Sequence, residues 1–404
     1  MKTIVFVRNS PTPRICNEVF ALKKTKKYRL VLLCETFNPG ALGSYTQIFD
    51  EIICCLPPVL DLKRYGLSQN IKNSPAIHHI KQILTLPMKH PMLHRLIRNR
   101  MISNLKNMEA DAFNCVDTYD LTKLTIKNSN APVIMDLQDG TSASGIKNLS
   151  KERYETDKYC YENVAGIIHR GSKVEIPYYK KHGYKINCQI FKYLDYCNKK
   201  FFADCNAKKL SYEDGEHHLI SMGSGMNHPG VIDIIKKFAK QKIHFHLYTV
   251  PHSLIRVDFY KEYYNLNKTE KYFHLEKAVS FDKVGREIAK YDFGSLILHP
   301  DQIKTMQPEY LKMALSYRIF TWLEAGLPII ISDDYEYMKS IIDGYNIGFG
   351  VSYDEVGNLH SVLDKFDNDE LKKNVLETRE ELSIDNYDKN LTNFYDTIIG
   401  KNEN

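Results

Sequence analysis

The stretch from Tyr317 to Val351, YRIFTWLEAGLPIIISDDYEYMKSIIDGYNIGFGV, decides the fold. An amphipathic segment ends at Gly326, which is well placed as a helix C-cap, and Pro328 prevents the helix from continuing. The run from Ile329 to Ser332 is apolar on both faces, as buried parallel strands are. The pattern predicts a helix, a buried strand and a second helix: 317–325, 328–332 and 335–342.

The same alternation extends outward from this stretch in both directions. Short β-branched runs, separated by helical segments, indicate parallel strands that are covered by helices on both faces. The sequence therefore predicts an α/β protein with two Rossmann-like doubly wound domains that face a central cleft. The expected strands outside the opening stretch are 3–7, 29–34, 51–56, 132–137, 217–222, 242–249, 271–277 and 293–299. The expected helices include 231–241 and 281–290.

Length and composition indicate where the chain divides. A chain of 404 residues exceeds one ordinary core and suits two domains. The segment 206–216 is polar, and all nine cysteines precede it. We expect an N-terminal domain at 1–205, a C-terminal domain at 210–380, and a last helix at about 381–404. The cysteines show no CxxC pair and are odd in number, which favours free thiols in a reducing cytoplasm.

Hydropathy and charge limit the kinds of binding partner that the sequence predicts. No segment has the roughly 18 to 20 apolar residues of a membrane span, so a cytoplasmic protein is expected. The net charge of +6 is modest and no nucleic-acid-binding motif is present, so nucleic acid is not an expected partner. The region 63–106 is basic, amphipathic and free of acidic residues. It fits peripheral binding to anionic lipid at the inner face of the membrane, and equally a solvated helical face.

The glycine-rich loop GSGMNHPG, residues 223–230, lies between an expected strand and an expected helix. Backbone amides at such a helix N-terminus can bind a diphosphate closely. We therefore expect Gly223, Ser224 and Gly225 to contact phosphate. The spacing differs from GxGxxG, and ordinary turn chemistry explains these glycines equally well.

Three features of the opening stretch together resemble a known motif: Arg318 at the helix start, the turn from Ala325 to Pro328, and the strand after it. They resemble the C-terminal donor-site motif of GT-B glycosyltransferases, especially those related to family 4. Segments 289–300 and 163–183 are also similar to that family. The resemblance implies a nucleotide-sugar donor, a saccharide or lipid-linked acceptor, transfer without a metal ion, and a role in surface polysaccharide or glycolipid synthesis. It also implies that the domain at 1–205 binds the acceptor, that the domain at 210–380 binds the nucleotide sugar, and that the last helix packs back on the first domain.

The resemblance and the glycine loop together predict a binding site for the nucleotide-sugar donor. Its expected residues are Gly223, Ser224, Gly225, His299, Tyr317, Arg318, Thr321 and Gly326. For Arg318 a surface or interdomain ion pair remains the alternative. Two departures from family 4 stand out: the glutamates of its E-x7-E pair are replaced by Met313 and Thr321, and no basic residue follows the glycines. Retention or inversion of the anomeric configuration therefore stays open.

Two residues of the first half are candidates for the base that takes the acceptor proton. Asp139 follows the expected strand 132–137, and His169 ends the apolar run 166–168. A loop-capping aspartate and a structural histidine are the alternatives. No metal site is predicted, because His217, His218, His244 and His246 lack a matching cysteine or carboxylate motif.

Two other functions share this architecture. A UDP-sugar 2-epimerase would turn over nucleotide sugar without any acceptor. A non-catalytic GT-B-like partner protein would bind no donor, and the missing glutamates favour it. Fold alone does not separate these three functions, because function resides in the site.

Overall fold

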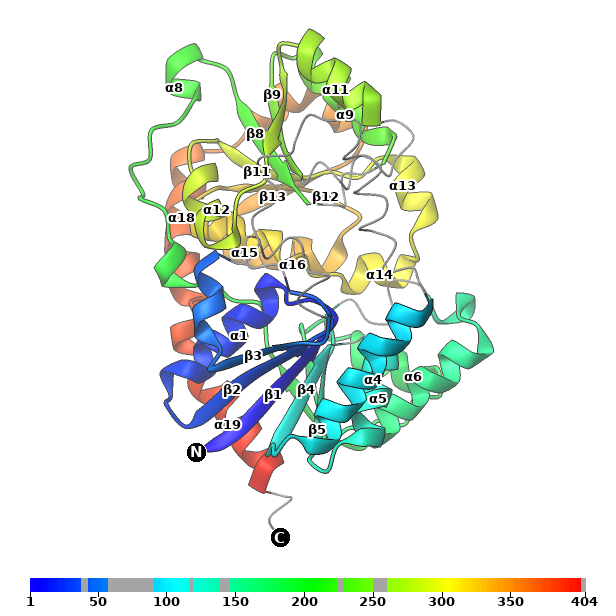
Figure 1. Cartoon of the computed structure of the whole chain (residues 1–404). Helices are drawn as coiled ribbons and strands as arrows, with labels where there is room; N and C mark the ends of the chain where they lie inside the picture. The colour runs from blue at the N-terminus through cyan, green and yellow to red at the C-terminus, as the bar shows by residue number, and fades with distance from the viewer. Residues whose placement is uncertain are drawn as a thin grey trace, which may run out of the picture.

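The computed structural model describes residues 1–37, 43–56, 91–116, 119–138, 145–223, 228–249 and 260–400. Over these residues the chain forms two parallel sheets, one above the other in Figure 1. The first has seven strands in the order β3-β2-β1-β4-β5-β6-β7, and the second has six in the order β10-β9-β8-β11-β12-β13. The predicted pair of doubly wound α/β sheets is confirmed.

The strands and helices have the following bounds. The first sheet contains β1 (Lys2–Arg8), β2 (Tyr28–Cys34), β3 (Glu51–Cys54), β4 (Ala112–Val116), β5 (Val133–Asp136), β6 (Gly166–His169) and β7 (Gln189–Lys192). The second contains β8 (His218–Met222), β9 (His244–Thr249), β10 (Phe273–Lys277), β11 (Phe293–Leu296), β12 (Ile329–Ser332) and β13 (Gly348–Val351). The helices of the first half are α1 (Pro13–Lys24), α4 (Pro91–Asn107), α5 (Tyr119–Asn128), α6 (Lys151–Asn163) and α7 (Glu175–Lys181). Those that follow are α8 (Ser211–Asp214), α9 (Gly230–Lys240), α11 (Tyr260–Thr269), α12 (Phe281–Ile288), α13 (Pro300–Thr305), α14 (Pro308–Met313), α15 (Arg318–Ala325), α16 (Glu336–Tyr345), α17 (Leu359–Leu363), α18 (Asn368–Glu381) and α19 (Asp388–Gly400).

The stretch that decides the fold forms α15, β12, α16 and β13. Gly326 takes a left-handed backbone conformation (φ 73°), and Leu327 N–H donates to the Trp322 carbonyl across the turn. Trp322 is fully buried and lies flat against β11, where a Cβ on Gly294 would come within 2.3 Å of the indole ring. The predicted helix, turn and strand therefore form one packed unit on the second sheet, where β12 lies between β11 and β13.

The end of the chain crosses from one sheet to the other. Helix α18 packs on α15 and α16, whereas α19 packs on α1 beside the first sheet, where both termini lie in Figure 1. The Tyr395 hydroxyl of α19 donates to the buried carboxylate of Glu18 in α1. The residue limits of the two domains stay a prediction.

The cysteines and the helices bear on two further expectations. All nine cysteines are free thiols. Within the described ranges, no helix has both the length and the apolar character needed to cross a bilayer.

A network of buried charges lies where the strands of the first sheet end. Arg170 pairs with Asp136 at 2.6 Å and with Asp195 at 3.0 Å, and Arg14 pairs with Asp195 at 2.8 Å. Arg8 lies 3.5 Å from Asp136. The side chains of these three arginines and two aspartates are all buried. Each charge has therefore lost its hydration and is stabilised by its ion-pair partners instead.

The buried network predicts that replacing Asp195 lowers the free energy of unfolding more than replacing Asp385, which lies outside the network. Asp195→Ala leaves Arg14 and Arg170 buried with fewer partners, and we expect it to lower the free energy of unfolding by about 3–5 kcal/mol. Asp385→Ala removes an exposed ion pair with Lys24 and is expected to cost less than about 1 kcal/mol. Urea denaturation of the two variants measures the difference. Equal losses would show that the network does not stabilise the fold.

Candidate functional site

A cavity of about 440 Å³ lies between the two sheets. Arg14 lines it from the start of α1, and Gln138 lines it from the loop after β5. Leu296, Tyr317 and Arg318 line it from the second domain. Open α/β sheets bind ligands at the carboxyl ends of their strands, and strands of both sheets end at this cavity.

Arg318 and Gly223 meet beside this cavity, although 95 positions separate their residue numbers. Gly223 follows β8 with φ 90°, a conformation that side chains rarely adopt. A Cβ on Gly223 would lie 3.9 Å from Arg318 Nε. Arg318 is also the first residue of α15, so its guanidinium and the positive end of that helix lie on the same side of the cavity. Two of the predicted donor-site residues are therefore neighbours.

Tyr317 links this region to the first domain. Its hydroxyl accepts a hydrogen bond from Asn17 Nδ2 at 3.0 Å, and Asn17 Oδ1 accepts one from the Tyr45 hydroxyl at 2.6 Å. Burial raises the pKa of Tyr317 well above its ordinary value, so the phenol stays protonated. The start of α15 is thus fixed by hydrogen bonds that cross the cleft.

His299 lies where the N-termini of two helices, α9 and α13, come together. Its Nδ1 accepts from Asp301 N–H at 3.2 Å and caps α13. Its ring packs directly on Gly230 at the start of α9, where a Cβ would lie 2.2 Å from Cγ. His228 lies 6.2 Å from the same ring, centroid to centroid. The starts of α9 and α13 therefore meet at the end of the glycine loop, whose residues Ser224 and Gly225 lie outside the described residues.

Comparison with known proteins agrees with this arrangement. Residues 235–393 match the family model described as glucosyltransferase 3-like, C-terminal domain. The structure is similar to HepE from Anabaena in complex with UDP-glucose, with a TM-score of 0.66 at 12% identity, covering 98% of this chain and 100% of that one. Sucrose-phosphate synthase from Thermosynechococcus elongatus gives 0.66 at 11% identity, with 99% and 100% covered. The chain has the GT-B glycosyltransferase fold.

One plant structure shares this GT-B fold at a lower similarity. Medicago truncatula UGT71G1 complexed with UDP-glucose gives a TM-score of 0.53 at 12% identity, with 98% of each chain covered. The sequence has no significant match among curated proteins.

Three further residues of interest lie away from the GT-B cavity. Gly326 sits at the far end of α15 from Arg318, against Leu376 and Arg379. Thr321 is 2% exposed and Met313 6% exposed, so both positions of the missing E-x7-E pair are buried. The structure therefore places Tyr317 and Arg318 at the cavity, with Gly223 beside Arg318, and does not bring Thr321 or Gly326 to it.

The two proposed bases are placed differently. Asp139 lies outside the described residues, immediately after Gln138, which lines the cavity. His169 ends β6, is 9% exposed, and its Nδ1 lies 3.4 Å from Glu175 Oε2 and 3.2 Å from Gly171 N. Because Nδ1 accepts from the Gly171 N–H, that hydrogen bond orients the imidazole, but His169 is not among the residues that line the cavity. Asp136, the other aspartate after the strand, is fully buried between Arg8 and Arg170.

Sequence reasoning missed Arg14, which lines the GT-B cavity and contacts both domains. Its Nη1 donates to the Gln138 carbonyl at 3.2 Å and its Nη2 to the Leu315 carbonyl at 2.7 Å. One signal was present: Arg14 stands in the first turn after the first strand, a position that faces the cleft in a doubly wound sheet.

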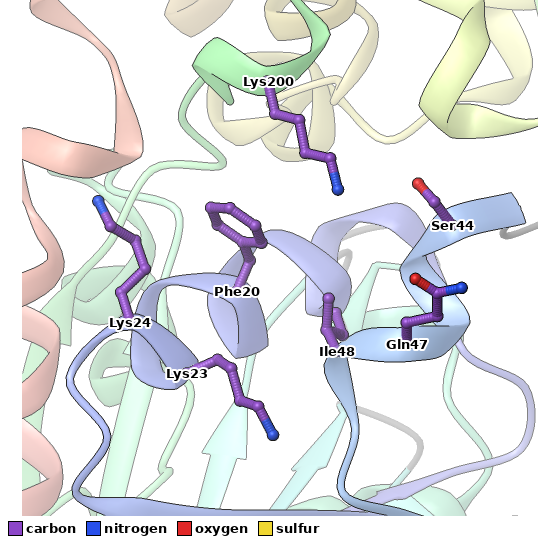
Figure 2. A pocket seen from close by; sticks show the side chains of 7 residues that line it. All are labelled: Phe20, Lys23, Lys24, Ser44, Gln47, Ile48 and Lys200. Carbon is purple, nitrogen blue, oxygen red and sulfur yellow. The ribbon is translucent and has the colours of Figure 1, made fainter.

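A second cavity, of about 260 Å³, lies between α1, η1 (Gly43–Ile48) and η5 (Lys199–Phe201). In Figure 2 Lys200 reaches into it from above, over Phe20 and Ile48. Lys23 and Lys24 also line it, but they pair with Asp50 and Asp385. It shares no lining residue with the cleft cavity, and its lysine charges are largely offset.

Glu324, a buried residue of α15, gives a pH test of the packing around that helix. Burial raises its pKa to about 8, and its Oε1 accepts from Asn198 N–H at 2.8 Å. Between the ordinary value of 4.5 and about 8 the folded state binds more protons than the unfolded state. Stability therefore falls as the pH rises through this window, by up to about 1.4 kcal/mol per pH unit.

We predict that Glu324→Gln removes this slope, because the amide oxygen still accepts from Asn198 and no charge can form. The variant should be more stable than the wild type at about pH 9 and close to it at about pH 5. Thermal unfolding across this range measures the effect, with the exposed Glu377→Gln as control. A slope unchanged in Glu324→Gln would contradict the assignment.

Proposed function

We propose that this protein is a glycosyltransferase that takes a sugar from a nucleoside diphosphate sugar bound to the second domain and transfers it to an acceptor held by the first. The observation that carries the proposal is the approach of Arg318 to Gly223 beside a cavity where strands of both sheets end. A guanidinium offers paired donors to phosphate oxygens, and a residue without a side chain allows a diphosphate to approach the backbone. Both are needed where a diphosphate leaves.

The proposed mechanism stabilises the departing diphosphate. Arg318 and the N-terminus of α15 supply positive charge on one side, and the backbone near Gly223 supplies amide donors on the other. HepE and UGT71G1 were solved with UDP-glucose, which makes UDP the first nucleotide to test. No divalent ion is part of the proposed donor site.

The acceptor would enter from the first domain. Asp139 is the proposed base because its neighbour Gln138 lines the cavity, and His169, whose Nδ1 accepts from the Gly171 N–H, is the second candidate. Hydrogen bonds from Arg14 and Asn17 to the second domain would hold the cleft closed and limit hydrolysis of the donor.

The acceptor class is proposed as a saccharide or a lipid-linked sugar of surface polysaccharide or glycolipid synthesis. Helix α4 supports a lipid-linked acceptor at a membrane surface. One stripe of this helix is buried and consists of Ile97, Met101 and Leu105. On the rest of the helix, Met92 is 76% exposed and Leu96 is 45% exposed, among basic residues. Most of the basic region 63–106 precedes this helix and lies outside the described residues. Kinship with family 4 is part of the same proposal.

A non-catalytic binding partner is the second candidate, because Met313 and Thr321 replace the glutamates that many family 4 enzymes carry. A UDP-sugar 2-epimerase is the third. It would consume nucleotide sugar without acceptor, so the dependence of turnover on acceptor separates it from a transferase.

We predict that one of UDP, GDP, CMP, dTDP, ADP or their sugar conjugates raises the unfolding midpoint of the wild type. A ligand at one hundred times its dissociation constant stabilises the folded state by about 2.7 kcal/mol. Arg318→Ala should lose most of this gain, because the diphosphate loses its cationic partner. A thermal-shift screen of both proteins measures it.

Arg29→Ala is the matched control, since Arg29 forms an exposed pair with Glu51 on the opposite edge of the first sheet. It should keep the full nucleotide response. If no nucleotide stabilises the wild type at millimolar concentration, the transferase proposal fails and the non-catalytic partner is favoured.

A further inference from the structure

Four histidines line one face of the second sheet, at the end away from the donor cavity. His218 and His244 are the first residues of β8 and β9 and pair in register, and His246 of β9 pairs in register with His274 of β10. His218, His244 and His246 are each about 95% buried. Imidazoles this buried must find partners for both ring nitrogens.

His218 and His246 form a row that has a carboxylate in contact with each end. His218 Nε2 lies 3.1 Å from Asp214 Oδ2, and its Nδ1 lies 2.9 Å from His246 Nε2. His246 Nδ1 lies 3.0 Å from Glu276 Oε1. The line from Asp214 to Glu276 therefore contains three contacts between nitrogen or oxygen atoms.

Counting protons shows that this line lacks one. Each contact needs one hydrogen, whereas two neutral imidazoles supply two and two carboxylates supply none. If His246 donates to Glu276 and His218 donates to His246, the lone pair of His218 Nε2 points at the carboxylate of Asp214. Two acceptors face each other there, and either an additional proton or a metal ion must lie between them.

A second imidazole converges on the same place. His244 Nε2 lies 3.5 Å from Asp214 Oδ2 and 2.8 Å from Glu216 Oε2, and its Nδ1 lies 2.8 Å from His274 Nε2. Ligand atoms of Asp214, His218 and His244 all lie within 4.8 Å of one another. Ligands about 2.0–2.1 Å from a tetrahedral ion are about 3.3 Å apart, close to the separations from Asp214.

We propose that His218, His244 and Asp214 bind one divalent cation of the zinc class, with Glu216 as the fourth ligand. One set of tautomers then satisfies every contact: the ion takes both Nε2 lone pairs, each Nδ1–H donates to a second imidazole, and His246 Nδ1–H donates to Glu276. Metal-bound histidines typically donate their other N–H in this way. The His218 and His244 rings stack at 4.3 Å, so binding requires a rotation about χ2.

The site would be structural. β8 spans five residues, so His218 and Gly223 lie roughly 15 Å apart at opposite ends of the strand. An ion here joins α8, in the segment between the two sheets, to the start of β8 and β9. The inference does not depend on the proposed glycosyl transfer. The carboxylate signal, Asp214 four residues before His218, lay in the polar segment 206–216 rather than in the strand pattern.

The test is metal analysis of the full-length chain. Protein stripped with EDTA and dialysed against Zn²⁺ should hold one ion per chain, and Zn²⁺ but not Mg²⁺ should raise the unfolding midpoint. Co²⁺ should give the strong visible bands of a tetrahedral site without a thiolate charge-transfer band. Wild-type protein that lacks these bands, or that binds Co²⁺ through cysteine, overturns the proposal without any variant.

Variants then locate the ion. His218→Gln and His244→Gln should lose it while keeping the far-ultraviolet circular dichroism of the wild type. The exposed His360→Gln should retain it, and His246→Gln should weaken it by about tenfold or more. If both ligand variants fold and keep one tightly bound ion, the assignment is wrong.

Discussion

The side chain of Arg14 is the contact on which the geometry of the cleft depends. It contacts three segments that are distant in sequence: Asp195 after β7, the Gln138 carbonyl after β5 and the Leu315 carbonyl before α15. The guanidinium is buried and always charged, so any movement of the second domain that broke these bonds would leave that charge poorly solvated. Leu315 stands three residues before Arg318, and this contact therefore positions the start of α15.

The remaining charges at the end of the first sheet reinforce that constraint. Asp195 is shared between Arg14 and Arg170, and Arg170 also pairs with Asp136. Nearby, burial raises the pKa of Glu18 to about 7, and its carboxylate accepts from the Tyr395 hydroxyl of α19. The last helix, the first sheet and the start of α15 are thus joined through polar contacts, and the cavity lies where those contacts meet.

The sequence-based predictions that were confirmed depended on short-range features: helix caps, helix breakers and apolar runs. Gly326 and Pro328 ended α15 where a C-cap and a helix breaker should, and apolar runs placed β8, β9 and β12 within two residues of their observed starts. The approach of Gly223 to Arg318 could be anticipated because both were expected at strand or helix ends on one edge of a parallel sheet. β4, β7 and β13 were not predicted, since their short runs are interrupted by a polar residue, too weakly apolar or too glycine-rich to stand out.

Contacts that depend on tertiary register could not be read from the sequence. Arg14 and Asp195 are 181 positions apart, and nothing in their local sequence indicates a partner. The histidines of β8, β9 and β10 looked like unrelated residues until strand register aligned them on one face. Thr321 and Gly326 were nominated through a motif, but one faces the core and the other lies at the far end of α15.

The most direct measurement is a crystal structure of the protein with the nucleotide sugar that binds it, beginning with UDP-glucose. The account predicts that the diphosphate lies between the backbone at Gly223 and the guanidinium of Arg318, within hydrogen-bond distance of both, and that the sugar faces the loop after β5. A nucleotide bound elsewhere, for example among Lys23, Lys24 and Lys200, would contradict it.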